Sequence, residues 1–352
     1  KGRIAVRVDG GGGPDSFVNQ SKASGGRVRF YDSRGDNDFD VGRGAKTDVN
    51  VYERPPGREV NHQYALDWGK KTVGLPIFLA SPDYGLLAGY LRSSDHYGYR
   101  KYPYAVRHTY GAAIATEGPE FVVMYRGDFR DVWGKAALSL AADYSGIAIT
   151  RYSGLGNDVQ TPEPSSNYDV EYRRITVAPS LIFQFGEQHA PETGGHEDIH
   201  RSEWTLKVGP LLKYSDTPTD GNEDTFLSSL PTAPYGAGSF GQVGARVSVE
   251  RDTRDRTGYP RSGIHLEAGG SVFPEVWDVE ETLSELHGQV SAYVSAGLPT
   301  LALRVGGEKL YGTFPYHEAA FLGGASNLRG FDAERFAGDA SLFGNAELRL
   351  PI

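Results

Sequence analysis

From about residue 68 onward, apolar and polar side chains alternate along the chain. In the clearest segment, Val243, Ala245, Val247 and Val249 share one face, and polar or charged side chains occupy the positions between them. Because neighbouring residues of a β-strand point to opposite faces of a sheet, this period of two predicts strands. Segments with this pattern cover 70–81, 85–93, 106–116, 119–129, 134–150, 170–185, 200–215, 240–251, 262–273, 284–297, 300–311 and 341–350.

The length and spacing of these segments favour a transmembrane antiparallel β-barrel. Its strands run for about ten residues, with an apolar outer face and a polar lumen. Long connections are expected at 151–169, 216–239 and 312–340, whereas tight turns such as Leu298-Pro299 lie on the other side. A soluble β-sandwich would also alternate, but its inward face would carry large side chains and its outward face mostly Lys, Glu and Thr. Here the polar face carries Gly, Ser, Ala and single charges.

Composition agrees with a large β-structure and excludes several classes of function. The chain has 352 residues with 46 Gly, 21 Tyr and 16 Phe, and aromatic side chains are enriched in strands. The absence of Cys excludes disulfides and thiolate chemistry. A formal net charge of -9 opposes a nucleic-acid partner. No apolar run approaches the roughly 18 residues of a membrane helix.

Residues 1–65 differ in character, and we predict a small Gly/Asp-rich β-domain there, with the barrel over 66–352. The triplet Val6-Arg7-Val8 recurs 22 residues later as Val28-Arg29-Phe30, and Phe17 recurs as Phe39. A fixed period of this length indicates two stacked strand–turn units. The polar Pro/Gly segment 53–58 is interpreted as a linker. The region is also compatible with the tail of a larger upstream domain.

The first of these units also matches a calcium-binding pattern. Residues 10–18, GGGGPDSFV, fit the β-roll repeat G-G-x-G-x-D-x-U-x, in which turn carbonyls and Asp carboxylates bind Ca²⁺ between stacked coils. The second copy is degraded, because Asn37 replaces the Asp. One interpretation is a Gly-rich stacked turn without metal. The other is a calcium site, with candidate ligands Asp15, Asp32, Asp36 and Asp38.

The most specific signal lies in residues 321–352, FLGGASNLRGFDAERFAGDASLFGNAELRLPI. A Gly pair, a Leu-Arg-Gly-Phe motif and a final strand with an inward acid resemble the signature of the bacterial surface-antigen superfamily, which includes the BamA/TamA-type assembly barrels and the two-partner secretion transporters. The residues that carry this match are Gly323, Gly324, Leu328, Arg329, Gly330, Phe331 and Glu347. A second match resembles the periplasmic turn before the ninth strand of the family, at Asp252, Arg254, Asp255, Tyr259, Pro260 and Gly263.

The resemblance covers about residues 68–352 and implies a barrel of the sixteen-stranded type, of which about twelve strands are present here. In the family, the loop after the eleventh strand folds into the lumen, and its arginine pairs with an acid on the wall. Carried over, Arg329 is that arginine and Glu347 is the acid. A guanidinium in a narrow lumen is partly desolvated, so we expect a buried pair whose loss would cost about 3–5 kcal/mol. Such a loop would gate the barrel; the alternative is a purely stabilising pair.

The resemblance implies a protein of the cell outer membrane that is not an enzyme and that assembles, inserts or translocates other proteins. Its expected partners are the lipid bilayer, lipopolysaccharide, and client or periplasmic accessory proteins. Two alternatives stay open, a membrane anchor for a fused upstream enzyme domain and a passive pore. POTRA repeats are not visible, four strands are missing from the count, and Lys1 follows no initiator Met or signal peptide. We therefore expect a mature or incomplete product.

One motif is typical of enzymes. Residues 196–200, HEDIH, fit H-E-x-x-H, which binds zinc in metalloproteases when both His lie on one face of a helix. The flanking Pro and Gly residues and the nearby start of a strand oppose a helix, so we interpret the match as chance in a polar turn. We find no G-x-S-x-G elbow and no P-loop, and we predict no catalytic residues, no metal beyond the calcium candidates and no other cofactor.

Overall fold

The computed structural model describes residues 5–11, 13–20, 27–32, 34–42, 45–49, 68–81, 85–116, 120–133, 136–162, 164–189, 201–256 and 258–350. The chain divides into two compact units, Lys1–His62 and Gln63–Ile352. The helices of the described residues are single turns, namely η1 (Ser165–Tyr168), α1 (Phe226–Ser229) and η2 (Tyr316–Glu318). None of them is long and apolar enough to cross a membrane.

The first unit is built from stacked parallel strands. One sheet has the order β1 (Ala5–Asp9), β3 (Arg27–Tyr31), β5 (Ala45–Asp48), and a second pairs β2 (Ser16–Asn19) with β4 (Asp38–Val41). The register places Val6 opposite Val28 and Phe17 opposite Phe39. This confirms the 22-residue repeat, which is the length of chain in the first coil. The ring of Phe17 packs on Phe30 and stacks on Phe39, with centroids 5.3 and 4.9 Å away, and supplies the core between the two sheets.

Glycine is needed where the second coil passes over the first. Gly35 has φ +98°, a conformation that favours residues without a side chain. A β-carbon on Gly35 would also overlap the carbonyl oxygen of Gly13 in the coil beneath. The turns therefore stack because both coils carry glycine at the point of contact.

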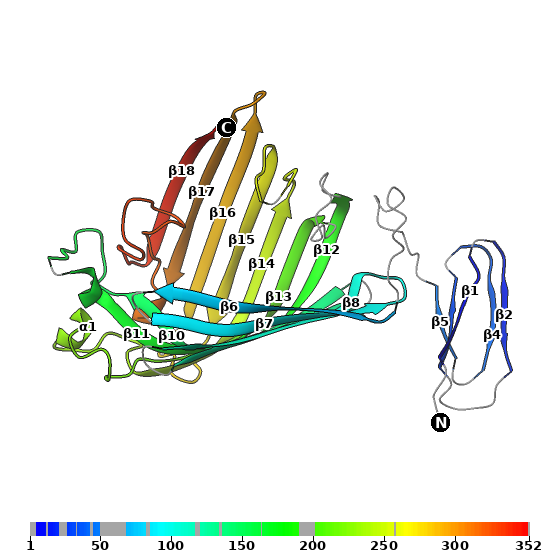
Figure 1. Cartoon of the computed structure of the whole chain (residues 1–352), viewed down its shortest axis with the longest axis horizontal. Helices are drawn as coiled ribbons and strands as arrows, with labels where there is room; N and C mark the ends of the chain where they lie inside the picture. The colour runs from blue at the N-terminus through cyan, green and yellow to red at the C-terminus, as the bar shows by residue number, and fades with distance from the viewer. Residues whose placement is uncertain are drawn as a thin grey trace. The chain divides into compact units, whose positions relative to one another are not determined.

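The second unit is a single large antiparallel sheet in which almost every strand pairs with the next in sequence (Figure 1). The sheet bends strongly, so that β6 to β10 lie across the foot of the upright strands β13 to β18. Its strands are β6 (Lys70–Ser81), β7 (Gly85–Gly98), β8 (Lys101–Ala115), β9 (Phe121–Trp133), β10 (Ala136–Arg151), β11 (Asp169–Val177), β12 (Ser180–His189), β13 (Arg201–Asp216), β14 (Ser239–Asp252), β15 (Gly263–Phe273), β16 (Leu283–Ser295), β17 (Thr300–Tyr311) and β18 (Ala340–Arg349). The predicted all-β class with a large antiparallel barrel sheet is confirmed.

One predicted strand is wrong. The segment 170–185 is not continuous, because β11 ends at Val177 and β12 begins at Ser180, and both pair with β10 and β13. The break falls at Ala178-Pro179, where Pro179 has no N–H to donate to a neighbouring strand. Thirteen strands therefore occupy twelve positions across the sheet.

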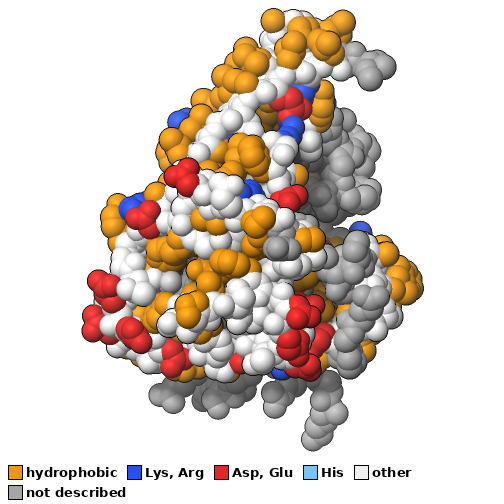
Figure 2. All heavy atoms as spheres, turned by 90° about the vertical axis from the view of Figure 1, so that its left-hand side faces the viewer, with side chains coloured by type: hydrophobic (Ala, Val, Ile, Leu, Met, Phe, Trp, Pro, Cys, Tyr) orange, Lys and Arg blue, Asp and Glu red, His pale blue; other side chains and the backbone are white. Residues whose placement is uncertain are grey.

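The two faces of the large sheet differ in polarity, because the outward face is exposed and apolar. Its outward positions carry exposed apolar side chains. Its inward positions carry buried polar side chains such as Gln242, Ser271 and Ser291, beside one buried apolar cluster that includes Phe240 and Phe273. In Figure 2, hydrophobic side chains run up the visible side of the sheet and Asp and Glu gather toward the lower end. No second sheet covers the apolar face among the described residues of this unit. This polarity opposes the sandwich alternative and is typical of a barrel wall. The exposed set includes Val247, Ile264, Leu286, Val290, Val294, Leu301, Leu303, Val305, Leu342 and Leu348.

The break between β11 and β12 gives a test of the packing. A β-carbon on Gly209 of β13 would overlap the carbonyl oxygen of Pro179. We expect Gly209→Ala to lower the free energy of unfolding by about 1–3 kcal/mol, as overpacking against a backbone does. The measurement is urea unfolding in detergent micelles, followed by far-UV circular dichroism. Gly288→Ala is the control, since its nearest atom would be 3.6 Å away, an ordinary contact. Equal stability of the two variants would show that Gly209 is not needed for the close approach of Pro179.

Candidate functional site

The loop between β17 and β18, residues 312–339, folds back along the inner face of the large sheet; we call it the inner loop. The carbonyl oxygen of Ser326 accepts a hydrogen bond of 2.8 Å from Arg304 of β17, and that of Asn327 accepts one of 3.1 Å from Asn345 of β18. Arg304 lies seven positions before Tyr311, the last residue of β17. At about 3.3 Å per residue, the tip therefore reaches about 23 Å down the wall from the end of the strand.

The tip is a compact turn closed by one amide side chain. Asn327 accepts from the N–H of Gly323 at 2.9 Å and donates to the carbonyl oxygen of Phe321 at 3.2 Å. The N–H of Gly324 donates to the carbonyl oxygen of Phe331 at 3.0 Å. Gly323 is buried with φ +134°, and a β-carbon there would overlap the carbonyl oxygen of Asp332. The Gly pair of the motif is therefore required by the close approach of the two arms of the turn.

The structure brings Arg329 and Glu347 together, but in a different environment from the one expected. Arg329 Nη1 lies 3.6 Å from Glu347 Oε2, and the two side chains are 71% and 40% exposed. The expected burial of the pair is wrong, because the guanidinium stands at the tip of the loop, where solvent reaches it. An exposed ion pair contributes about 0–1 kcal/mol rather than the larger value of a buried one. Glu347 Oε1 also accepts a shorter hydrogen bond, of 3.0 Å, from Arg349 Nε.

The rest of the motif lies on the same tip. Leu328 is half-buried, Gly330 has φ +94°, and Phe331 is exposed with its ring 5.3 Å from that of Phe336. The motif thus presents an arginine and an aromatic ring at the end of a compact turn. A gating role for these residues stays a prediction.

The first part of the inner loop is anchored across the interior on β13 and β14. The short helix η2 supplies three successive polar side chains, and each meets a partner on the inner wall. The Tyr316 hydroxyl and Thr217 share a hydrogen bond of 2.9 Å, and the His317 imidazole and Ser215 share another of 2.9 Å. The Glu318 carboxylate accepts hydrogen bonds from Lys213 at 2.9 Å and from Gln242 at 2.7 Å. The imidazole of His317 also stacks on Tyr172, with centroids 5.3 Å apart, and burial lowers its pKa, so that the neutral form is favoured.

The returning arm is anchored on the end of β10. Glu334 Oε2 accepts from Thr150 Oγ1 at 2.8 Å and from the N–H of Arg151 at 2.9 Å. Asp332 Oδ2 lies 3.2 Å from Arg151 Nη1, and Arg335 Nη2 donates to the carbonyl oxygen of Val159 at 2.8 Å. Glu334 has φ +53°, an uncommon conformation for a residue with a side chain, and these bonds hold it there.

The sequence did not indicate these anchors. Glu318 and Glu334 lie in a long polar loop, and their partners are far away in the chain, from 76 positions for Glu318 and Gln242 to 184 for Glu334 and Thr150. Only Asn327 carried a local signal, since Asn between a Gly pair and a turn motif commonly bonds its own backbone. The inner loop is therefore tethered at three regions of the wall, of which the motif had indicated one.

The predicted turn between the eighth and ninth strand positions connects β14 to β15. Arg254 donates from Nε and Nη2 to the two oxygens of Asp252 at 2.8 and 2.7 Å, and Asp252 is 8% exposed. Asp255 Oδ1 accepts from the N–H groups of Arg261 and Ser262 at 2.9 and 3.3 Å. Desolvation raises the pKa of Asp255, but these hydrogen bonds outweigh it, so the pKa lies below its usual value. Both carboxylates act to close the turn.

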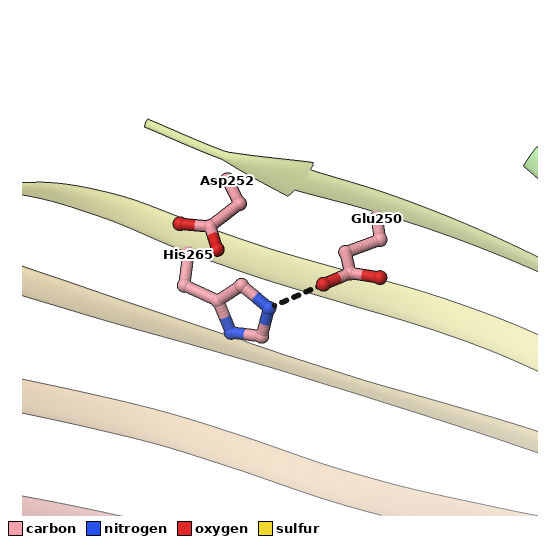
Figure 3. Close-up of side chains that lie close together, drawn as sticks. All are labelled: Glu250, Asp252 and His265. Atoms are coloured by element: carbon pink, nitrogen blue, oxygen red, sulfur yellow. Dashed lines mark hydrogen bonds and ion pairs between the residues drawn. The ribbon is translucent and has the colours of Figure 1, made fainter. Parts of the chain in front are cut away.

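A cluster of Glu250, Asp252 and His265 beside this turn offers donor atoms of the kind that bind metals (Figure 3). His265 Nε2 lies 3.0 Å from Glu250 Oε1, and Lys207 Nζ lies 3.5 Å from Glu250 Oε2. Asp252 is already held by Arg254. Each carboxylate therefore has a partner from the protein itself, and we interpret the cluster as an ion-pair network.

The calcium candidates of the first unit separate into two groups. Asp15 and Asp32 face one another near Gly10, whereas Asp36 and Asp38 are exposed. Asn37, the residue that replaces the expected Asp, accepts from the N–H of Asp15 at 2.9 Å. The H-E-x-x-H match at 196–200 lies outside the described residues.

The low pKa of Asp255 leads to a pH-dependent prediction. A carboxyl whose folded pKa is depressed stabilises the protein above its unfolded pKa, about 3.9, and that contribution is lost as the pH falls through the folded value. We expect Asp255→Asn to lower the urea midpoint at pH 7 and to have a much smaller effect near pH 3. Urea unfolding of both proteins at the two pH values measures the difference. A loss that is the same at both values would show that the charge is not responsible.

Comparison with known proteins gives a match at the level of fold. No family model matches the chain, and no curated protein sequence matches it. Among solved structures it is similar to BamA from Haemophilus ducreyi lacking POTRA domains 1–3, with a TM-score of 0.54 and 11% sequence identity. The match covers 80% of this chain and 53% of the BamA chain, so this chain spans about half the length of that protein. At this identity the likeness shows the fold, which is that of a BamA-like β-barrel.

Proposed function

We propose that this chain belongs to an outer-membrane barrel that assembles, inserts or translocates other proteins, and that the inner loop controls passage along its interior. The observation that carries the proposal is the position of the inner loop, whose tip lies beside Arg304, Asn345 and Glu347 deep on the inner wall. A loop held there occupies the path along the wall. An open pore would not need three separate anchors for one loop.

The outer face of the large sheet supports the location. Its exposed side chains are apolar over β14 to β18, as lipid contact requires. Exposed aromatic side chains lie at the strand ends, with Trp68 just before β6 and Trp133 at the end of β9. Aromatic rings favour the boundary between lipid and water. The proposed partners are therefore the bilayer with its lipopolysaccharide, and client and accessory proteins.

The strengths of the three anchors suggest how the inner loop moves. The contacts of η2 and of Glu334 are hydrogen bonds from partly or fully buried groups. The tip is held by the Arg329 contact, which is long and exposed, by one exposed hydrogen bond from Arg304 and by one hydrogen bond from Asn345. Segments with few buried contacts open first, so the tip is released before either arm. A client segment that competes for Glu347, Arg304 and Asn345 would thus displace the tip and leave the arms in place.

A second function is favoured by the first unit. Its parallel coils form a compact body separate from the barrel sheet, as expected for part of an exported domain that the barrel anchors or carries. In that case the level of other outer-membrane proteins would not depend on this chain. The two functions therefore differ in the experiment that follows.

Arg329→Ala tests the proposed control of passage. Because the pair is exposed, we expect the free energy of unfolding to change by less than about 1 kcal/mol. We expect the insertion or export of client proteins to fall clearly, because a tip without its contact to Glu347 is no longer held in the position from which a client displaces it. Client levels in the outer membrane of cells that produce only the variant measure the effect, together with urea unfolding of the purified protein.

Arg256→Ala is the matched control, because Arg256 is also a partly exposed arginine with one ion pair, to Asp255 at 3.4 Å, and lies in the turn after β14. It should leave client levels unchanged. Normal client levels in the Arg329 variant would rule out control by the tip. Unchanged client levels when the whole chain is absent would favour the anchor.

A further inference from the structure

A carboxylate in the first unit is buried without a donor for one of its oxygens. Asp32, which follows β3, is 1% exposed. Its Oδ1 accepts from the N–H of Arg34 at 3.1 Å, but no hydrogen-bond donor among the described residues reaches Oδ2. A buried carboxylate oxygen with no partner is rare, because it has lost its water and gained nothing in return. The site calls for a group that the described residues do not supply.

A second carboxylate points to the same place. Asp32 occupies in the second coil the position that Gly10 occupies in the first, and the N–H of Gly10 donates to the carbonyl oxygen of Tyr31 at 3.1 Å. Asp15 Oδ2 lies 2.8 Å from the position a β-carbon of Gly10 would take, and Asp32 Oδ2 lies closer still. The two oxygens therefore lie close together over Gly10, where the absence of a side chain leaves room for them beside the ring of Phe17.

Two facing carboxylates repel one another unless something positive lies between them. The pKa of Asp15 is raised, first by desolvation and then by the neighbouring carboxylate of Asp32, which repels its charged form. A shared proton or a bound cation would each relieve the repulsion. The donor atoms are oxygens from two Asp side chains, with no nitrogen or sulfur, and Ca²⁺ prefers such ligands and completes its shell with carbonyl oxygens and water.

We propose that Asp15 and Asp32 bind one Ca²⁺ between the first two coils, and that this ion stabilises the stack. The ligand set differs from that of the sequence pattern. Asp15 is the sixth residue of the first repeat, whereas Asp32 is the first residue of the second repeat. One site is therefore assembled from the two coils. Asp36 and Asp38 are exposed and take no part. The site is independent of the function of the barrel.

The test is calcium titration of the whole chain, purified in detergent and stripped with a chelator, by isothermal titration calorimetry at pH 7. We expect one Ca²⁺ per chain, and binding weakened by roughly tenfold or more in Asp32→Asn and in Asp15→Asn. Asp36→Asn is the matched control, because it removes the same charge from the same turn, and it should bind like the unmodified protein.

Limited proteolysis of the first unit, with calcium or with chelator, gives the second readout. Calcium should slow cleavage in the unmodified protein and in Asp36→Asn, but not in Asp32→Asn. In chelator, Asp32→Asn should resist cleavage at least as well as the unmodified protein does in chelator. The proposal is overturned if the unmodified protein binds no calcium. It is equally overturned if Asp36→Asn loses binding as Asp32→Asn does, or if protection follows pH but not calcium, as a shared proton would require.

Discussion

Everything in the large sheet depends on the continuous pairing of backbone N–H and C=O groups between neighbouring strands. In lipid no water replaces a missing partner, so a strand can cross only if its neighbours satisfy it. The ladder between β13 and β14 shows the consequence, because it runs without a shift from Trp204 opposite Arg251 to Asp216 opposite Ser239. Once that register is fixed, each side chain is committed to one face, since a slip of one residue would turn all of them over.

The same commitment produces the polar interior on which the inner loop depends. Inward positions of β13, β14, β17 and β18 bear groups that can hold a loop, among them Lys213, Gln242, Arg304 and Asn345. The inner loop satisfies these groups, and they in turn fix its path. The path of the inner loop is thus determined partly by side chains of the wall and partly by its own turn residues. This explains why the loop has a defined shape without regular secondary structure.

Much of the fold could be predicted from the sequence because its determinants are local. Alternation of side chains located eleven of the twelve strand positions as continuous strands, and the repeat of 22 residues gave the register of the first two coils. The break at Pro179 was missed because the apolar alternation continues on both sides of it. The contact between Arg329 and Glu347 came from a resemblance, but its exposure depends on the surrounding tertiary structure. The anchors of Glu318 and Glu334 could not be predicted, because no local pattern records a partner on a distant strand.

The stacked coils of the first unit have a consequence for how its length could change in evolution. Because β1, β3 and β5 pair in parallel, each coil presents to the next the same edge that it received from the last. Duplication of one 22-residue repeat would therefore insert a complete layer and lengthen the unit by about 4.8 Å, the spacing of paired strands. The layers beneath would need no compensating substitution. The length of the unit is therefore set by its number of repeats.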